Sequence, residues 1–196
     1  MYFSRMKAKY SFIIPVYNRP EEVSELLQSF YEMKTQISYE IVIVEDGSTI
    51  SSDEIVKEYS SVLNIQYLEK ENTGPGDSRN YGMRKATGEY FIILDSDVVM
   101  PNHYLNSVEE FLEENPVDCF GGPDAAKENF SEIQKAINFV MTSFLTTGGI
   151  RGKEKSVKNY EPRSFNMGIS REAFQKTGGF GTIHPGEDPD LSIRII

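Results

Sequence analysis

Four short, mostly apolar runs, separated by stretches with helical spacing of apolar residues, constrain the fold of this chain more than any other feature. The runs cover residues 11–16, 40–44, 65–68 and 90–94. Runs of this length are typical of strands that are buried on both faces. Strands that alternate with helices over short links predict a mainly parallel sheet flanked by helices, with right-handed crossovers. The expected fold class is therefore α/β.

Helix signals lie between and after these runs. Pro20 and the two glutamates that follow it predict a helix start, because proline suits the first helical position and acids suit the positive end of the helix dipole. Ser51 and Glu54 have capping-box spacing, which predicts the start of the next helix. Residues 74–77 are expected to form a loop before a helix over 78–86. The other expected elements are helices from 101, over 131–145, over 171–177 and from 186, and a strand over 165–169.

Polar clusters follow three of the expected strands. They are Tyr17-Asn18, Glu45-Asp46 and Asp95-Ser96-Asp97. Ligands of parallel α/β sheets bind beyond the carboxyl ends of the strands, so we expect the clusters to face one site. The two carboxylates of Asp95-Ser96-Asp97 are hard oxygen ligands that suit Mg²⁺ or Mn²⁺. A lone D-x-D is more often an ordinary acidic turn, but its place directly after a buried strand favours a metal site.

The composition narrows the classes of function. Of the 196 residues, 39% are hydrophobic and 26% are charged, as in ordinary globular proteins, and the formal net charge is −10. This acidity argues against nucleic-acid binding, and an acidic enzyme that handles phosphates needs a cation or a few well-placed Arg and Lys to neutralise them. The two histidines do not lie at zinc-site spacing.

Cysteine usage and hydropathy bear on the compartment. The single cysteine, Cys119, excludes an intrachain disulfide and indicates a reducing compartment, and its apolar neighbours favour a small buried side chain over a nucleophile. No segment approaches about 18 uninterrupted apolar residues. We therefore expect a soluble, cytoplasmic protein, with attachment to the inner face of a membrane left open.

Six short motifs follow one another along nearly the whole chain. They are Pro15-Val16-Tyr17-Asn18, Val44-Glu45-Asp46-Gly47-Ser48, Arg79-Asn80, Gly88-Glu89-Tyr90 before the D-x-D, Gly178-Gly179-Phe180 and Glu187-Asp188. Each is weak alone, but in this order they resemble the family 2 glycosyltransferases, inverting enzymes with the GT-A fold. The resemblance implies a single Rossmann-like GT-A domain over 1–196, with a nucleotide-sugar-binding half at about 8–100 and an acceptor-side half at about 101–196. Because family members usually continue further, the natural chain is expected to be longer or the given chain trimmed.

The resemblance also implies a nucleotide site. Tyr17 would lie against the nucleobase, and Asp46 would accept a hydrogen bond from the edge of the base, as in relatives that use uridine nucleotides. Pro15, Asn18 and Glu45 would shape or line the same pocket, with Glu45 standing where many relatives have Asp.

The phosphate and metal end of the site is implied in the same way. Arg79 would contact the base or a phosphate, and Asp95 and Ser96 would lie near the ribose and the metal. Asp97 would be the direct ligand of Mn²⁺ or Mg²⁺, with Asp95 as a second ligand.

The implied reaction is transfer of a sugar from a nucleoside-diphosphate sugar, with a UDP-sugar favoured, to a hydroxyl of a glycan or lipid-linked acceptor. Asp188 would be the catalytic base, with Glu187 as the second candidate. A polysaccharide or glycolipid of the cell envelope is the expected product. One alternative is a sugar-nucleotide nucleotidyltransferase, which residues 17–20 disfavour because they lack a Gly-rich loop with Arg and Lys. A catalytically inactive nucleotide-sugar-binding module is the other.

Several features of the second half fit more than one role. The basic stretch 151–158 is either a lid over a diphosphate or phosphorylated lipid, or a solvated loop, and the helix over 131–145 is expected in the core rather than on a membrane. His184 either touches the acceptor or a phosphate, or has no special role. Asn166 and Met167 are expected on the acceptor side.

Overall fold

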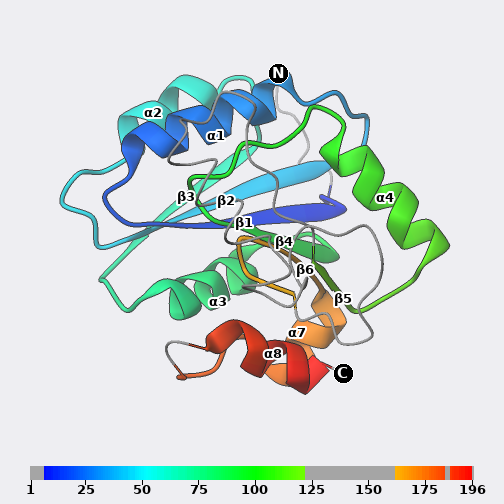
Figure 1. Cartoon of the computed structure of the whole chain (residues 1–196). Coiled ribbons are helices and arrows are strands. Elements are labelled where there is room, and N and C mark those ends of the chain that lie inside the picture. The colour runs from blue at the N-terminus through cyan, green and yellow to red at the C-terminus, as the bar shows by residue number, and fades with distance from the viewer. Residues whose placement is uncertain (1–6, 122–161, 184–185, 196) are drawn as a thin grey trace, which may run out of the picture.

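The computed structural model describes residues 7–121, 162–183 and 186–195, and its centre is a six-stranded sheet (Figure 1). The strand order is β3-β2-β1-β4-β6-β5. β1 to β4 are parallel, and β6 runs antiparallel to both β4 and β5. The strands are β1 (Tyr10–Val16), β2 (Tyr39–Asp46), β3 (Ile65–Lys70), β4 (Tyr90–Leu94), β5 (Cys119–Gly121) and β6 (Asn166–Ser170). The predicted mainly parallel α/β sheet is confirmed.

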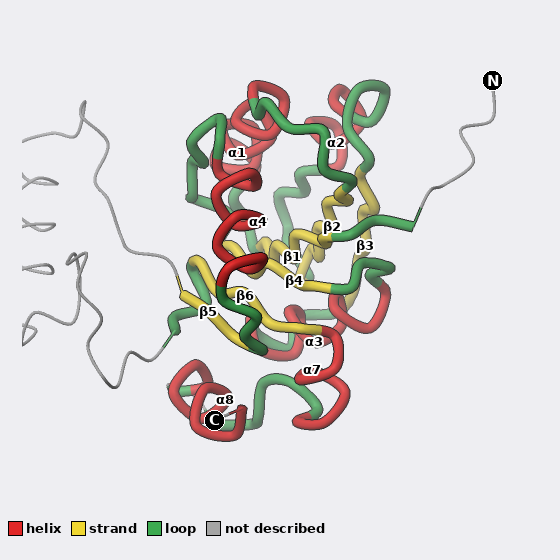
Figure 2. The backbone as a smooth tube through the Cα atoms, turned by 90° about the vertical axis from the view of Figure 1, so that its right-hand side faces the viewer, coloured by secondary structure: helices red, strands yellow, loops and turns green. Residues whose placement is uncertain are grey.

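Helices cover both faces of the sheet (Figure 2). α1 (Pro20–Glu32), α2 (Asp53–Tyr59) and α4 (Tyr104–Glu114) pack on one face, and α3 (Pro75–Lys85), α7 (Arg171–Thr177) and α8 (Glu187–Ile195) pack on the other. None of the helices in the described ranges has the length and hydrophobicity needed to cross a membrane.

Both faces of β1 are buried, which explains why apolar and polar residues do not alternate along its sequence. Phe12 and Ile14 pack into the core beneath α1, whereas Ile13 packs into the core beneath α3, and all three side chains are fully buried. Phe12 meets the ring of Phe30 edge-on at 4.7 Å between centroids. A strand buried on both faces is typically a nearly continuous apolar run, which is the pattern of β1 apart from the buried Ser11.

α3 lies unusually close to the sheet, and Gly82 permits this approach. A Cβ at Gly82 would lie 2.8 Å from Cγ2 of Ile13 and 3.1 Å from Cγ2 of Val44. Because α3 follows β3, its first turn starts at the carboxyl edge of the parallel strands. Polar residues of that turn are therefore delivered to the edge where the candidate site lies.

Two predicted boundaries are wrong in an instructive way. β2 continues through Glu45 and Asp46, which were expected to follow the strand over 40–44, because both residues pair in register with neighbouring strands. α3 begins at Pro75 rather than at 78, with the proline at the first helical position. β5, a strand of three residues, was not predicted.

The capping box expected at Ser51 is absent. α2 has Ser52 as its N-cap residue, without a side-chain capping bond, and Ser52 instead gives its hydroxyl and its N–H to the Glu45 carboxylate. Ser51 accepts a local hydrogen bond from the Asp53 N–H at 3.1 Å. The Ser52 hydroxyl therefore bonds to the buried Glu45 carboxylate of β2 instead of capping α2.

Other expectations agree with the structure or lie outside it. The strand over 165–169 and the helix over 171–177 are present as β6 and α7, and Gly178 ends α7 with a left-handed backbone (φ 77°). The thiol of Cys119 is partly buried, and burial, then Asp118, raises its pKa to about 12, as expected for a thiol without nucleophilic character. The helix over 131–145, the basic stretch 151–158 and His184 lie outside the described residues.

Candidate functional site

The polar clusters after β1, β2 and β4 leave the sheet at the same edge. Val16 pairs with Glu45 across β1 and β2, and Ile13 pairs with Ile93 across β1 and β4. Adjacent parallel strands in this register end side by side. The expectation that the clusters meet at one edge of the sheet is therefore confirmed.

Asn18 ties the loop after β1 to the loop after β2. Its Oδ1 accepts hydrogen bonds from the N–H groups of Thr49 at 2.7 Å and Ile50 at 2.9 Å, and its own N–H donates to Ser48 Oγ at 2.8 Å. Asn18 adopts φ 54°, a left-handed conformation that asparagine tolerates better than most residues. Tyr17, next to this joint, is 53% exposed, so its ring is available to a ligand.

Glu45 is buried near the end of β2, and the turn that follows β2 folds over its carboxylate. Its carboxylate accepts hydrogen bonds from the hydroxyls of Ser48 and Ser52, from Ser52 N at 3.1 Å and from Tyr67 OH at 2.8 Å. Burial, together with this bond, raises the pKa of Tyr67 to about 12. Glu45 thus supports the wall of the site, and direct contact between Glu45 and a nucleotide stays a prediction.

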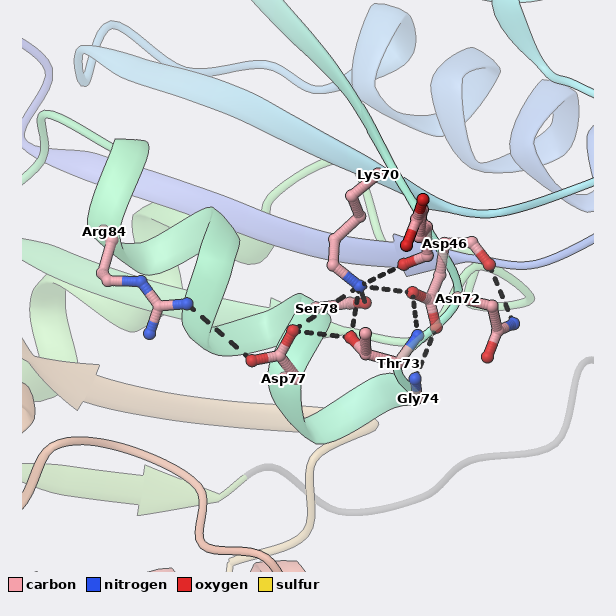
Figure 3. Close-up of polar contacts among 9 residues, drawn as sticks. Asp46, Lys70, Asn72, Thr73, Gly74, Asp77, Ser78 and Arg84 are labelled. Carbon is pink, nitrogen blue, oxygen red and sulfur yellow. Dashed lines mark hydrogen bonds and ion pairs between the residues drawn. The ribbon is translucent and has the colours of Figure 1, made fainter.

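Asp46 is the acid that the loop before α3 surrounds. Oδ1 accepts from Lys70 Nζ at 2.6 Å and from Thr73 N at 3.0 Å, and Oδ2 accepts from Gly74 N at 2.9 Å (Figure 3). Burial opposes ionisation of this carboxyl, but the hydrogen bonds from Lys70 and Thr73 outweigh it and lower the pKa of Asp46.

Arg79 connects the D-x-D segment with the Glu187-Asp188 segment. Its NH2 lies 3.0 Å from Asp95 Oδ1, and its NH1 lies 3.6 Å from Glu187 Oε1 and 4.0 Å from Asp188 Oδ1. Phe180 supports the guanidinium, whose central carbon lies 5.3 Å from the ring centroid. The Arg79 guanidinium of α3 therefore joins the residue that follows β4 to the first turn of α8.

This meeting point leaves polar atoms without hydrogen bonds. Nε and NH1 of Arg79 and Oδ1 of Asp188 are buried and unsatisfied, whereas Oδ2 of Asp188 accepts from N and Oγ of Ser164, both at 3.1 Å. Each unsatisfied buried group costs about 1–3 kcal/mol, so native proteins keep few of them. An acceptor oxygen and two donors that lie this close together without hydrogen bonds are groups that a bound polar substrate could satisfy.

The D-x-D carboxylates differ in their surroundings. Burial raises the pKa of Asp95, the Arg79 cation opposes that effect, and the charges of Asp97 and Asp188 add to it. Asp97 is more open: its side chain is 58% exposed and lies 3.5 Å from Arg19 NH1. Ser96 between them is buried. Asp95 and Asp188 both lie within 4.0 Å of the Arg79 guanidinium, and Asp97 follows Asp95 by two residues, so the D-x-D segment and Asp188 lie on the same side of the molecule.

The two D-x-D carboxylates fit a divalent ion only as a partial set of ligands. In the part of the chain that the structure describes, no three His, Cys, Asp or Glu side chains are gathered to hold a metal ion. Mg²⁺ and related ions are commonly held by one or two carboxylates, with substrate phosphates and waters completing the shell. The donor chemistry of Asp95 and Asp97 is therefore compatible with Mn²⁺ or Mg²⁺.

Three residues that build this site were not predicted from the sequence. Lys70 pairs with Asp46 in the β2–β3 register, Asn80 holds the loop around Phe180 by two hydrogen bonds, and Ser164 orients Asp188. Only Asn80 carried a signal, as the partner of Arg79 in a motif. Asn166, expected on the acceptor side, accepts a hydrogen bond from Tyr104 OH at 2.5 Å.

Comparison with known proteins agrees with this architecture. The model of the family described as Glycosyl transferase family 2 matches residues 11–178. A chondroitin synthase of Escherichia coli is 30% identical over 161 residues, which are 78% of this chain and 24% of that protein.

Two solved structures share the fold. One is Staphylococcus aureus TarS 1–349 in complex with UDP-GlcNAc, with a TM-score of 0.72 at 22% identity over 95% of this chain and 53% of that chain. The other is a mannosyltransferase from Pyrobaculum calidifontis in complex with GDP-Man and Mn²⁺, with a TM-score of 0.70 at 20% identity over 97% of this chain and 52% of that chain. The chain therefore spans only part of the length of each of these three proteins.

Proposed function

Because this chain belongs to glycosyl transferase family 2, we propose that it transfers a sugar from a nucleoside-diphosphate sugar to an acceptor hydroxyl with inversion at the anomeric carbon. One observation carries the proposal: the buried Arg79 guanidinium lies between Asp95 and Asp188, so the expected donor end and the expected base share one site. The acceptor class that we favour is a growing polysaccharide or a lipid-linked glycan, in keeping with the chondroitin synthase relative.

Donor binding is assigned to the loops after β1 and β2. The exposed ring of Tyr17 offers a stacking surface for a nucleobase, and Asp46 offers a carboxylate oxygen to the edge of the base. The two structural neighbours carry UDP-GlcNAc and GDP-Man, whose bases both present an imino N–H to such an acceptor. We favour a UDP-sugar as the donor.

Asp97, with Asp95 as the second ligand, is the group that we assign to Mn²⁺ or Mg²⁺. When bound, such an ion stabilises negative charge on the departing diphosphate. Arg79 offers NH1 and Nε, which have no hydrogen-bond partner, to oxygens of the same diphosphate. The chain carries a formal net charge of −10, so a cation at this place also offsets the repulsion of an anionic donor.

Asp188 is assigned the role of base. Ser164 holds one carboxylate oxygen. The other, Oδ1, lies 4.0 Å from Arg79 NH1 and has no hydrogen bond, so it can accept the proton of the acceptor hydroxyl as that hydroxyl attacks the anomeric carbon. Bond formation and departure of the diphosphate then occur in a single displacement, so no covalent intermediate with the protein is required. Glu187, 3.6 Å from Arg79, is the second candidate.

Calorimetry with UDP, GDP, ADP and CDP, each with and without Mn²⁺, tests donor recognition, and we expect UDP to bind most tightly in the presence of Mn²⁺. Release of UDP from UDP-sugars then tests turnover. Binding without turnover against any acceptor would instead support an inactive nucleotide-sugar-binding module, and failure to bind any of the four nucleotides would contradict the proposal.

A further inference from the structure

Lys70, at the end of β3, is enclosed by acceptors. Its Nζ donates to Asp46 Oδ1 at 2.6 Å, to the Glu71 carbonyl at 2.8 Å and to Ser78 Oγ at 3.3 Å, and it also reaches Thr73 Oγ1 (Figure 3). Only 13% of its side chain is exposed. An ammonium has three N–H donors, so these contacts leave none for a ligand.

A second acid holds the ammonium from the α3 side. Asp77 Oδ2 lies 3.5 Å from Lys70 Nζ and accepts a hydrogen bond from Thr73 Oγ1 at 2.6 Å. Arg84, two turns further along α3, lies 3.9 Å from the other oxygen of Asp77. Lys70 therefore sits between the carboxylates of β2 and α3 and fixes both relative to the loop that joins β3 to α3.

The two oxygens of Asp46 differ in their donors. Lys70 and Thr73 donate to Oδ1, Gly74 donates to Oδ2, and the Ser78 hydroxyl also contributes a hydrogen bond to this carboxyl. Oδ2, which accepts from the Gly74 N–H at 2.9 Å, is the oxygen that suits the imino N–H of uracil or guanine. Cytosine and adenine have an unprotonated ring nitrogen at the corresponding edge, which a carboxylate repels.

We propose that Lys70 is a positioning residue for nucleobase recognition: it holds Asp46 in place as a charged acceptor for the imino N–H of uracil or guanine. The inference rests on the proposed function, since it concerns the same donor site. Lys70 acts through Asp46 and makes no contact with the base.

Charge balance around Asp46 explains why a cation is needed at this place. Burial favours the neutral acid, and the bonds from Lys70 and Thr73 reverse that preference, so the pKa of Asp46 lies below its usual value. The charged groups facing Asp46 are Lys70 from β3 and, behind it, Asp77 and Arg84 from α3. Without the ammonium, burial and the nearby Asp77 charge would both favour protonation of Asp46.

Calorimetry with UDP and CDP between pH 5 and pH 8 tests the proposal on Lys70→Met, which removes the charge at similar length, and on Lys70→Arg, which keeps it. Each variant is compared with wild type at the same pH, so titration of the nucleotide phosphates cancels. We expect Lys70→Met to weaken UDP binding about tenfold or more, since hydrogen bonds to charged groups are the strong ones. The difference in UDP affinity between Lys70→Met and wild type should grow as the pH falls. The ratio of UDP affinity to CDP affinity should be smaller in Lys70→Met than in wild type. Lys70→Arg should largely restore the affinity, the preference and the pH profile.

Lys57→Met is the matched control, because Lys57 forms an exposed ion pair on α2 away from this site. Lys70→Gln, which is neutral but retains a donor, gives the same test if Lys70→Met does not fold. A Met or Gln variant with wild-type affinity, selectivity and pH profile would overturn the role of Lys70 while leaving the proposed function intact. Wild-type protein that binds neither nucleotide would overturn both.

Discussion

Asn80 and Phe180 are joined by a reciprocal pair of hydrogen bonds across 100 residues of chain. Asn80 Nδ2 donates to the Phe180 carbonyl and Phe180 N donates to Asn80 Oδ1, both at 2.9 Å, and both residues are buried. Asn80 follows Arg79 on α3, and Phe180 packs against the Arg79 guanidinium. The pair therefore fixes α3 relative to the segment that leads to Asp188.

Asn80→Ala should lower the free energy of unfolding by about 2 kcal/mol, because both bonds are lost and two buried main-chain groups lose their partners. Urea denaturation measures this difference. Asn64→Ala is the control, since the Asn64 side chain is exposed and makes one long bond to the Tyr39 carbonyl at 3.4 Å. Equal stabilities of the two variants would show that the reciprocal pair contributes nothing.

Alanine substitutions at two adjacent glycines distinguish the effect of backbone strain from the effect of steric overlap. Gly178 and Gly179 have φ values of 77° and 82°, so alanine is strained at both. A Cβ at Gly178 meets nothing within 4 Å, whereas one at Gly179 would lie 2.1 Å from Asn80 Oδ1. Gly178→Ala should lower the free energy of unfolding by about 1 kcal/mol. Gly179→Ala should lower it further, because its Cβ would break the hydrogen bonds of Asn80. Urea denaturation of both variants checks the order, and a reversed order would contradict the close approach.

Asp97→Ala should abolish the gain in UDP affinity that Mn²⁺ produces, while leaving metal-independent binding nearly unchanged. The reason is that Asp97 is the more exposed D-x-D carboxylate and has only a 3.5 Å contact with Arg19 to lose. Calorimetry with and without Mn²⁺ measures both quantities. Glu110→Ala, an exposed acid on α4, controls for the change in net charge. A Mn²⁺ effect that survives in Asp97→Ala would show that the metal assignment is wrong.

Asp188→Asn should reduce sugar transfer by about 10²- to 10⁴-fold with little change in UDP affinity, because a neutral amide cannot take the proton of the acceptor. Glu187→Gln should have a smaller effect if Asp188 is the base. Transfer rates and UDP dissociation constants separate the two steps. Glu172→Gln, on the exposed face of α7, serves as the control. If Glu187→Gln showed the larger loss of turnover, the two roles would have to be exchanged.

The Asp46–Lys70 pair predicts a pH-dependent stability. The pKa of Asp46 is lower in the folded chain than its ordinary value of 3.8, so its contribution to stability is complete above that pH and is lost as the pH falls further. Asp46→Asn leaves the buried Lys70 without its closest carboxylate and should cost about 3 kcal/mol at pH 7. Urea denaturation at pH 7 and pH 3 measures the free energy of unfolding of Asp46→Asn and of wild type. The difference between the two proteins should be smaller at pH 3 than at pH 7.

Asp53→Asn is the control for the Asp46–Lys70 pair, since Asp53 and its partner Lys57 form an ion pair on the surface. We expect the free energy of unfolding of Asp53→Asn to be close to that of wild type at both pH values, because solvent screens exposed ion pairs. A difference between Asp46→Asn and wild type that stays constant from pH 7 to pH 3 would contradict an ionised Asp46 in the folded state.

Local sequence was sufficient for the parts of the fold that repeat a pattern. Phe12 and Ile13 lie on opposite faces of β1 and are both buried, so the apolar run itself indicated a central strand. The order of motifs indicated the family, which the match over residues 11–178 confirms. β5, with three residues, was too short to carry such a pattern. The capping box at the start of α2 was wrongly predicted because the Ser52 hydroxyl donates to Glu45, which is on another element.

The amino-acid sequence by itself determined the alternation of strands and helices, the edge of the sheet where the polar residues gather, and the family. Hydrophobic periodicity and short motifs are local properties, so they can be recognised without coordinates. Only the tertiary structure decided which charges meet: Arg79 with Asp95 and Asp188, and Lys70 with Asp46 and Asp77. These contacts depend on strand register and on how closely α3 and α8 approach the sheet, and both are set by packing between segments far apart in the chain.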